Sequence, residues 1–167
     1  MKSNNFSMKK NLLLILTAAV IGLSSCSSSS PEKALEEFYQ YKGKEETVMD
    51  PLILSGGNVV PLVLEKVKNK QMPKRRYAIG FLGNGNYVES LPILKELVSN
   101  DSEEALIRGD SLLAIYQIDQ SIGREMAIKF KDDSSFLGKI AKDIIAGNAA
   151  IAKRSYLEAL LDDHSAK

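Results

Sequence analysis

The residue types that most often carry out catalysis or bind metal are scarce in this chain. It has one cysteine, Cys26, and one histidine, His164, in 167 residues. Zinc sites and nucleophilic triads need several such side chains held close together on rigid elements. His164 is three residues from the C-terminus, where chains tend to fray. We therefore expect no metal site and no Cys-His or Ser-His-Asp catalytic set.

Two further patterns have a structural interpretation rather than a chemical one. Gly80, Gly83 and Gly85 have a spacing similar to that of a phosphate-binding loop, but they follow a helical pattern instead of a strand. We interpret Gly83 or Gly85 as a left-handed residue that ends a helix. Adjacent carboxylates point apart on a helix and are expected on solvated faces; these pairs are Glu36-Glu37, Glu103-Glu104 and Asp162-Asp163. The sequence predicts no catalytic residue, no cofactor and no enzymatic activity.

The first 25 residues have the three parts of an export signal. Lysines precede an apolar run from Leu12 to Leu23, and small residues follow it. A run of about a dozen apolar residues is too short for a spanning helix, which needs about 20. We therefore expect residues 1–25 to be removed. Translation can start at Met1 or at Met8, and the expectation is the same for both.

The residues Leu23-Ser24-Ser25-Cys26 resemble the lipobox of bacterial lipoproteins. In that family the cysteine receives diacylglycerol on its sulfur, and the signal is cut just before it. The resemblance implies that Cys26 becomes a lipidated N-terminus, which also explains the lone thiol of an exported protein. Several acyl chains on one residue give a stable anchor. We expect a lipid-anchored protein of the bacterial cell envelope. In such lipoproteins a serine after the cysteine is compatible with transfer to the outer membrane, and an acidic run serves surface display in some phyla. Ser27 follows Cys26 and no acidic run does, so we favour the outer membrane facing the periplasm, and the inner membrane stays open.

The charge balance excludes one class of partner. The whole chain has a formal net charge of +1, and its first 25 residues contain three lysines and no acidic residue, so the rest has a net charge of −2. Nucleic-acid-binding domains are usually strongly basic, so we expect no nucleic-acid partner. The one concentrated group of charges, called here the basic cluster, consists of Lys66, Lys68, Lys70, Lys74, Arg75 and Arg76. It either faces anionic lipid or an acidic partner, or it is a solvated surface with Arg76 paired across repeats.

Apolar residues recur at helical spacing along the rest of the chain. Residues 26–31 form the lipidated cysteine and a Ser-rich tether, residues 32–49 a first helix and a connection, and residues 50–163 a repetitive helical domain. The apolar stripes are Ala34, Leu35, Phe38 and Tyr39; Tyr87, Leu91, Leu94 and Val98; Ile140, Ala141, Ile144 and Ile145; and Tyr156, Leu157, Leu160 and Leu161. No segment alternates with period two, so the sequence predicts an all-α fold.

The repetitive domain contains a sequence repeat. Residues 59–67 match residues 90–98, with Pro61 aligned to Pro92. Both prolines are expected in the first turns of helices, where the missing amide donor costs little. A helix pair cannot bury its apolar face alone, whereas stacked pairs share a continuous core. The repeat therefore predicts stacked helix pairs.

The alignment extends through the turns between helices. Asn69, Asp101 and Asp133 fall at equivalent positions, and Arg76 aligns with Arg108. Asp101, with Glu104 three residues later, has the spacing of a capping pair at the start of the next helix.

These residues resemble the HEAT family of helical repeats, in particular the short repeats of phycobilisome lyases. The best match is residues 75–85 and a looser one is residues 107–115, whereas Ile140 replaces the arginine in the third pair. The resemblance covers residues 50–147 and implies a short α-solenoid of stacked antiparallel helix pairs. A tetratricopeptide-like array is the alternative, because its period is about 34 residues, but its Trp and Tyr positions are absent here.

The HEAT resemblance also implies where a partner binds. In that family the second helices of the pairs line a concave surface, which places Lys74, Arg75, Tyr77 and Asp110 near it. We therefore expect a non-catalytic scaffold or adaptor that is anchored through Cys26 and binds an envelope protein or peptide at these four residues. The alternatives are a small-ligand or lyase-like HEAT-repeat enzyme and a structural envelope lipoprotein. The oligomeric state stays open.

Overall fold

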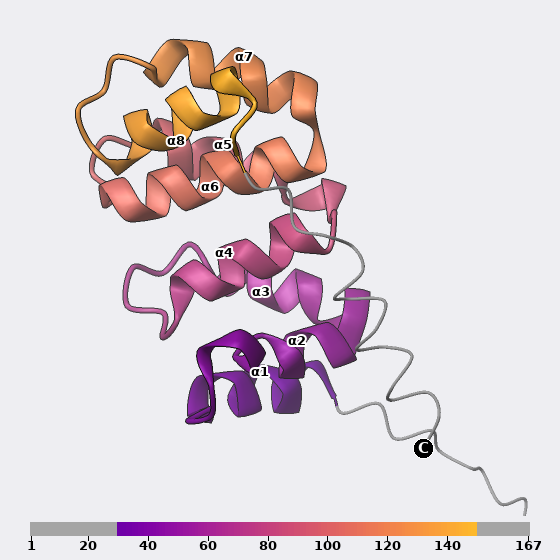
Figure 1. Cartoon of the computed structure of the whole chain (residues 1–167). Helices are drawn as coiled ribbons and strands as arrows, with labels where there is room; N and C mark the ends of the chain where they lie inside the picture. Colours follow the sequence, from indigo (N-terminus) through magenta and orange to yellow (C-terminus); the bar gives the residue numbers. More distant parts are fainter. Residues whose placement is uncertain (1–29, 150–167) are drawn as a thin grey trace, which may run out of the picture.

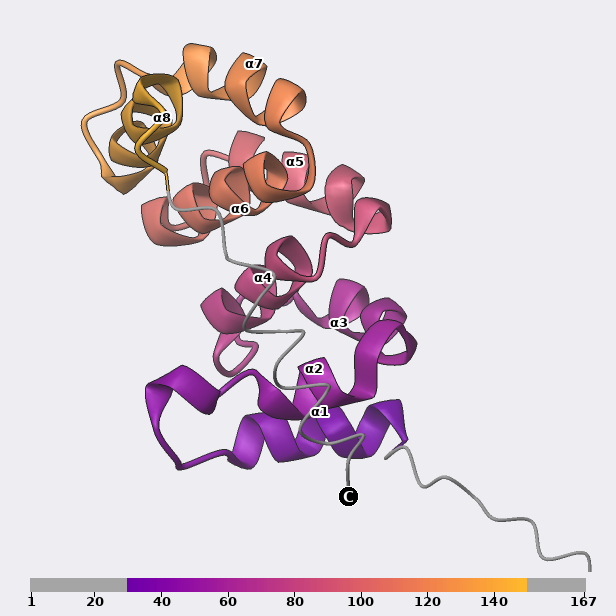
Figure 2. The same ribbon diagram turned by 45° about the vertical axis from the view of Figure 1, so that its right-hand side comes forward.

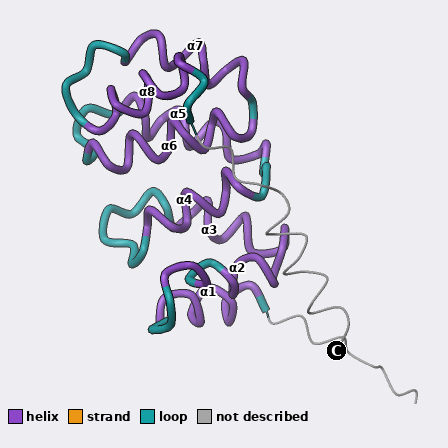
Figure 3. The backbone as a smooth tube through the Cα atoms, viewed as in Figure 1, coloured by secondary structure: helices purple, strands orange, loops and turns teal. Residues whose placement is uncertain are grey.

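The computed structural model describes residues 30–149, and every regular element in this range is a helix (Figures 1 and 3). The α-helices are α1 (Pro31–Gln40), α2 (Asp50–Ser55), α3 (Val60–Lys66), α4 (Arg75–Asn84), α5 (Leu91–Ser99), α6 (Ala105–Ile118), α7 (Gln120–Phe130) and α8 (Phe136–Ala146). Short 3-10 helices precede α2, α3 and α5; they are η1 (Glu45–Thr47), η2 (Gly56–Val59) and η3 (Val88–Ser90). The predicted all-α fold is confirmed. The predicted signal segment, Cys26, the apolar stripe of residues 156–161 and His164 lie outside the described residues.

The helices run back and forth between two edges of the molecule, so that successive connections lie on alternate edges (Figures 1 and 2). Near one end, α1 packs against α2 and α3. Towards the other end, α6 contacts α4, α5, α7 and α8 and is the helix that joins the earlier part of the chain to the later part. The position of α6 explains why it is the longest described helix and why it is buried on most sides.

One apolar core runs through these helices. The predicted stripe of α1 is confirmed, since Ala34, Leu35 and Phe38 are buried. The stripe predicted for residues 87–98 begins too early, because Tyr87 lies before α5 and packs its ring 5.1 Å from that of Phe81. The stripe predicted for α8 is also too wide, because Ile145 is exposed.

The helix starts at the two aligned prolines agree with the sequence. Pro61 lies in the first turn of α3 and Pro92 in the first turn of α5. Pro51 likewise lies in the first turn of α2. The C-cap residue of α2 is Gly56, which has a φ of 61°. At each of these positions the ring replaces an amide that has no partner within the helix.

Three of the connections contain the same hydrogen bond. The side-chain oxygens of Asn69, Asn100 and Asp133 accept from the backbone N–H two residues further on, at 2.9, 3.0 and 2.7 Å. This bond closes an Asx turn and leads the chain from one helix towards the next. The sequence alignment was right for Asn69 and Asp133, but it was wrong by one residue at Asp101, whose place is taken by Asn100.

Two predicted helix ends are wrong. Asp101 does not cap α6; it pairs with Arg108 at 2.9 Å, and the N-cap residue Glu104 makes no side-chain capping bond. The left-handed residue after α4 is Asn86, with a φ of 55°, whereas Gly85 has an ordinary φ of −78°. Asparagine tolerates this conformation better than most residues, so glycine is not needed there.

The stretch Glu45–Lys66 is long and apolar enough to cross a membrane by length and composition, with a mean hydropathy of 1.4 over 18 residues. It does not form one straight helix, because it is divided into η1, α2, η2 and α3, and Gly56 has a positive φ of 61° where α2 meets η2. Leu52, Val59 and Val63 from this stretch lie in the core.

Gly83 allows α4 to approach α6 closely. A Cβ at Gly83 would lie 2.7 Å from Ala114 Cα and would also collide with the carboxamide of Gln117. One turn earlier, the nearest atom to a Cβ at Gly80 would be Met49 Sδ at 3.8 Å, which is an ordinary contact. The close packing of α4 against α6 therefore needs a glycine at position 83 but not at position 80.

Alanine substitutions separate these two roles. We expect Gly83→Ala to lower the free energy of unfolding by about 1–3 kcal/mol, because the added methyl group overpacks the contact between α4 and α6. Gly80→Ala has room for its methyl group and should raise that free energy by up to about 1 kcal/mol, through higher helix propensity. Urea denaturation of both variants measures the difference, and equal effects would contradict the close approach at Gly83.

Candidate functional site

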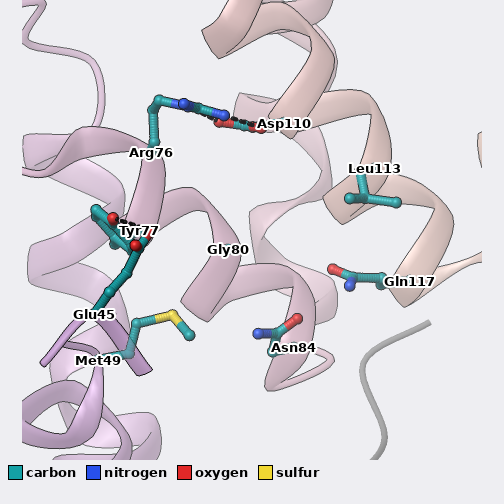
Figure 4. A pocket seen from close by; sticks show the side chains of 9 residues that line it. All are labelled: Glu45, Met49, Arg76, Tyr77, Gly80, Asn84, Asp110, Leu113 and Gln117. Atoms are coloured by element: carbon teal, nitrogen blue, oxygen red, sulfur yellow. Dashed lines mark hydrogen bonds and ion pairs between the residues drawn. The ribbon is translucent and has the colours of Figure 1, made fainter. Parts of the chain in front are cut away.

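A pocket lies between α4, α6 and the segment that leads into α2. It has a volume of about 310 Å³. The residues that line this α4–α6 pocket are Glu45, Met49, Arg76, Tyr77, Gly80, Asn84, Asp110, Leu113 and Gln117 (Figure 4). Its volume is at the lower limit of the range for small-molecule sites, which is roughly 300–1,000 Å³.

The two helices contribute equivalent faces to this pocket. Tyr77, Gly80 and Asn84 follow the i, i+3, i+7 spacing of one face of α4. Asp110, Leu113 and Gln117 follow the same spacing on α6, and each lies 33 residues after its counterpart on α4. The pocket is therefore the space between two matching helix faces, held open where Gly80 has no side chain.

One end of the pocket is closed by two charged contacts. Arg76 donates through Nε to Asp110 Oδ2 at 2.6 Å and through a terminal nitrogen to Oδ1 at 3.2 Å. Tyr77 donates its hydroxyl to Glu45 Oε1 at 2.7 Å, and this bond raises the pKa of the phenol. The predicted ion pairing of Arg76 is found, and its partner Asp110 lies on α6. As half the Arg76 side chain is exposed, the ion pair is worth roughly 0–1 kcal/mol.

The other end of the pocket carries two carboxamides, Asn84 from α4 and Gln117 from α6 (Figure 4). Within residues 30–149, neither side chain has a hydrogen-bond partner, and both are partly buried. A carboxamide offers two donor hydrogens and an acceptor oxygen. These two side chains are therefore the polar groups of the pocket that remain available to a ligand.

A second, uncharged pocket adjoins the first along α4. It has a volume of about 210 Å³, and it shares Met49 and Asn84 with the α4–α6 pocket. Its remaining lining residues are Ile53, Leu54, Gly56, Phe81, Gly85 and Tyr87. An apolar surface therefore continues from the α4–α6 pocket towards the end of α2.

The charged groups that line these pockets make contacts within the molecule. Among the residues that line them there is no cysteine, serine or histidine, and the charged groups Arg76, Asp110 and Glu45 are engaged with one another or with Tyr77. No group of three or more His, Cys, Asp or Glu that could hold a metal ion is found in residues 30–149. The lining suits a ligand with an apolar portion and hydrogen-bonding amide groups.

The four residues predicted to bind a partner fall in two places. Tyr77 and Asp110 line the α4–α6 pocket. Lys74 and Arg75 line a separate pocket of about 260 Å³ beside the connection between α3 and α4, where Tyr77 also contributes. Lys74 has a left-handed φ of 54°, and its Nζ donates to the carbonyl of Tyr39 at 2.5 Å, which ties this connection to α1.

Arg75 is a buried residue rather than a surface one. Its guanidinium donates to both carboxylate oxygens of Glu103, at 2.7 and 2.9 Å, and its Nε donates to the carbonyl of Val67 at 2.6 Å. The two charged side chains are 6% and 3% exposed. Arg75 therefore holds the end of α3 and the start of α6 against α4, and its guanidinium does not face solvent.

The structural counterpart of Arg75 is Arg108, so the sequence alignment of Arg76 with Arg108 is wrong by one residue. Arg108 donates from Nε to the carbonyl of Val98 at 2.9 Å, just as Arg75 donates to Val67. In both cases an arginine in the first turns of one helix satisfies a carbonyl at the end of the preceding helix.

Most of the basic cluster is engaged within the molecule. Lys66 pairs with its neighbour Glu65 at 2.9 Å, and Lys70 donates to the carbonyl of Ser102 at 2.6 Å. With the contacts of Lys74, Arg75 and Arg76, five of its six side chains have a partner in the structure. The cluster therefore joins connections to each other as well as carrying surface charge.

Sequence reasoning missed most of the α4–α6 pocket. Gly80 was interpreted as part of a helix end, and Asn84, Leu113 and Gln117 were not singled out. A usable signal was present, because continuing the i, i+3, i+7 face from Tyr77 reaches Gly80 and Asn84. No such signal exists for Glu45, which comes from a connection.

Together, the described residues form an all-α fold with a pocket lined by apolar side chains, two carboxamides and paired charged groups. No protein-family model, curated protein or solved structure matches the chain. The proposal below therefore depends on the residues themselves.

The buried pair of Arg75 and Glu103 predicts a pH-dependent stability. The guanidinium holds the pKa of Glu103 below its usual range, so the pair stabilises the fold above the unfolded pKa, about 4.3. That contribution is lost as the pH falls through the lowered folded pKa. At pH 7, Glu103→Gln should cost about 3–5 kcal/mol, because it leaves a buried guanidinium unpaired.

The matched control is Glu104→Gln, which removes a neighbouring, exposed carboxylate. Denaturant unfolding from pH 7 to below pH 4 should show the gap between the wild type and Glu103→Gln narrowing on acidification. Glu104→Gln should track the wild type. A constant gap across this range would show that Glu103 does not act through its charge.

Proposed function

We propose that this chain is a lipid-anchored, non-catalytic binding protein of the bacterial cell envelope. Its described part forms a short α-solenoid that holds a segment of a partner protein in the α4–α6 pocket. The observation that carries the proposal is the combination of apolar lining residues with two carboxamides, between matching faces of α4 and α6, that have no hydrogen-bond partner among residues 30–149. We place the anchor on Cys26, in the outer membrane facing the periplasm.

Two recurrences support the α-solenoid and its resemblance to HEAT repeats. The bonds of Arg75 and Arg108 to the carbonyls at the end of the preceding helix are equivalent. The Asx turns recur at intervals of 31 and 33 residues. Stacked repeats are expected to reuse the same local contacts, since each unit solves the same packing problem.

The lining of the pocket supports a peptide segment as the ligand. A primary carboxamide has the donors and acceptor of a peptide group, so Asn84 and Gln117 can bind main-chain amides of any sequence. Met49 and Leu113 offer an apolar contact for one side chain. Binding by main-chain contacts together with a side-chain pocket is a common way to recognise extended peptides.

Replacing the anchoring residue tests the first half of the proposal. We expect Cys26→Ala to abolish incorporation of labelled fatty acid and to move the protein out of the membrane fraction, because Cys26 is the only thiol in the chain. Cell fractionation and fatty-acid labelling measure both effects. Unchanged labelling and unchanged membrane association would refute the anchor.

Filling the pocket tests the second half. A photo-reactive residue in place of Leu113 should capture one dominant protein in the cells that make this chain, identified by mass spectrometry. Gly80→Phe should abolish this capture, because its ring occupies the space beside Met49, whereas Gly80→Ala should preserve it.

Both Gly80 variants are first checked for native melting behaviour. Equal capture by a folded Gly80→Phe variant would move the binding site away from the pocket. Absence of any specific adduct, or capture of abundant bystanders alone, would overturn protein binding. A thermal shift with small ligands would then favour a small-molecule site.

A further inference from the structure

The alternation of connections gives the molecule two chemically different edges (Figures 1 and 2). The N-terminal edge consists of Ser30 and the connections at residues 55–59, 84–90 and 118–120. The opposite edge consists of the connections at residues 41–47, 67–74, 100–104 and 131–135. The described chain therefore begins on the first of these edges.

Charge is distributed unequally between the two edges. Each of the four connections on the opposite edge has at least three charged residues. The connections of the N-terminal edge contain Glu89 and Asp119 as their charged residues, and Asp119 is engaged in accepting from Ile122 N at 2.9 Å. The first turn of α1 adds Glu32 and Lys33, whose charges offset each other. The N-terminal edge thus has few charged residues, with a formal net charge of −2, and it has no basic residue in its connections.

Apolar side chains are exposed on the same edge. Leu54, at the end of α2, is 40% exposed, and Val88, before α5, is 59% exposed. The uncharged pocket of about 210 Å³ is lined by Leu54 and Gly56 at the end of α2 and by Gly85 and Tyr87 in the connection that also contains Val88. Single exposed apolar residues are common, but these two lie at connections on the edge where the described residues begin.

The position of Ser30 limits how far this edge can be from an anchor. Cys26 is four residues before Ser30. An extended chain covers at most about 3.6 Å per residue, so these two residues are at most about 14 Å apart. A bilayer that holds acyl chains attached to Cys26 is therefore close to the end of the N-terminal edge that carries Ser30.

We propose that the N-terminal edge is a lipid-facing surface, with Leu54 and Val88 inserted in the interfacial region of the bilayer that holds Cys26. This inference rests on the proposed lipid anchor. The proposal also places the basic cluster away from the bilayer, because Lys68, Lys70 and Lys74 lie in the connection at residues 67–74 on the opposite edge. The cluster then faces away from anionic lipid headgroups and towards the aqueous compartment.

Tryptophan fluorescence tests this orientation, because the chain has no tryptophan and a single substitution reports one position. Variants carrying Leu54→Trp or Val88→Trp are purified from bacterial membranes and reconstituted in phosphatidylcholine vesicles. Their fluorescence is compared between vesicles with brominated acyl chains, which quench at short range, and vesicles without bromine. Both variants should lose most of their emission in brominated vesicles.

The controls are matched for exposure. Leu106→Trp replaces a residue that is 39% exposed at the start of α6 on the opposite edge, and Ile128→Trp replaces one that is 59% exposed on α7. Both should keep their emission. Equal emission changes at all four positions, or no quenching at positions 54 and 88, would overturn the lipid-facing surface.

The same samples distinguish this failure from a failure of the anchor. Mass spectrometry of the N-terminal peptide reports whether Cys26 carries acyl chains. If Cys26 is acylated but fluorescence at positions 54 and 88 is not quenched, the lipid anchor is supported and the proposed orientation is refuted. If fluorescence at those positions is quenched but Cys26 is not acylated, the lipid-facing surface is supported and the anchor on Cys26 is refuted.

Discussion

The packing of α4 against α6 is the constraint on which the rest of the structure depends. At the start of α4, Arg75 reaches Glu103 just before α6, and Arg76 reaches Asp110 on α6 itself. At the end of α4, Gly83 lets the backbone approach Ala114. Polar contacts therefore fix the relation of the two helices at one end, and a steric contact fixes it at the other. The α4–α6 pocket is the space left between these fixed points, so the contacts at the two ends of α4 set its shape.

The buried ion pair contributes specificity to this arrangement more than stability. Removing two charges from water is costly, and an apolar pair of similar size often packs as well. The guanidinium of Arg75, however, binds Glu103 in two places and the carbonyl of Val67 in a third. These three bonds are satisfied together in one register of α3, α4 and α6. A shift by one residue would leave a buried charge and a buried carbonyl without partners, which is a large penalty against misaligned packing.

The helices of this fold were predictable because periodicity and proline positions are local signals. Which residue of a basic run is buried was not predictable, since Lys74, Arg75 and Arg76 are chemically alike. A helix turns about 100° per residue, so neighbours point in different directions, and an alignment error of one residue exchanges an inner for an outer side chain. Gly83 posed the same difficulty. A glycine near a helix end suggests a terminator, whereas its actual neighbour, Ala114, lies on another helix. The pocket depends on such distant pairings, which is why two of its residues were predicted and the others were missed.

The two edges follow from the same alternation that builds the helix array. A chain that runs back and forth places every second connection on the same side, so the composition of connections can differ between sides without affecting the core. On the opposite edge, charged residues also serve the fold, as when Lys70 and Glu103 join one connection to another part of the chain. The N-terminal edge uses glycine, asparagine and capping residues instead, which shape turns without adding basic charge. A surface of this kind avoids the cost of desolvating lysine and arginine against lipid. The edge that is nearest the start of the described chain is thus also the edge that a bilayer would accept with the least penalty.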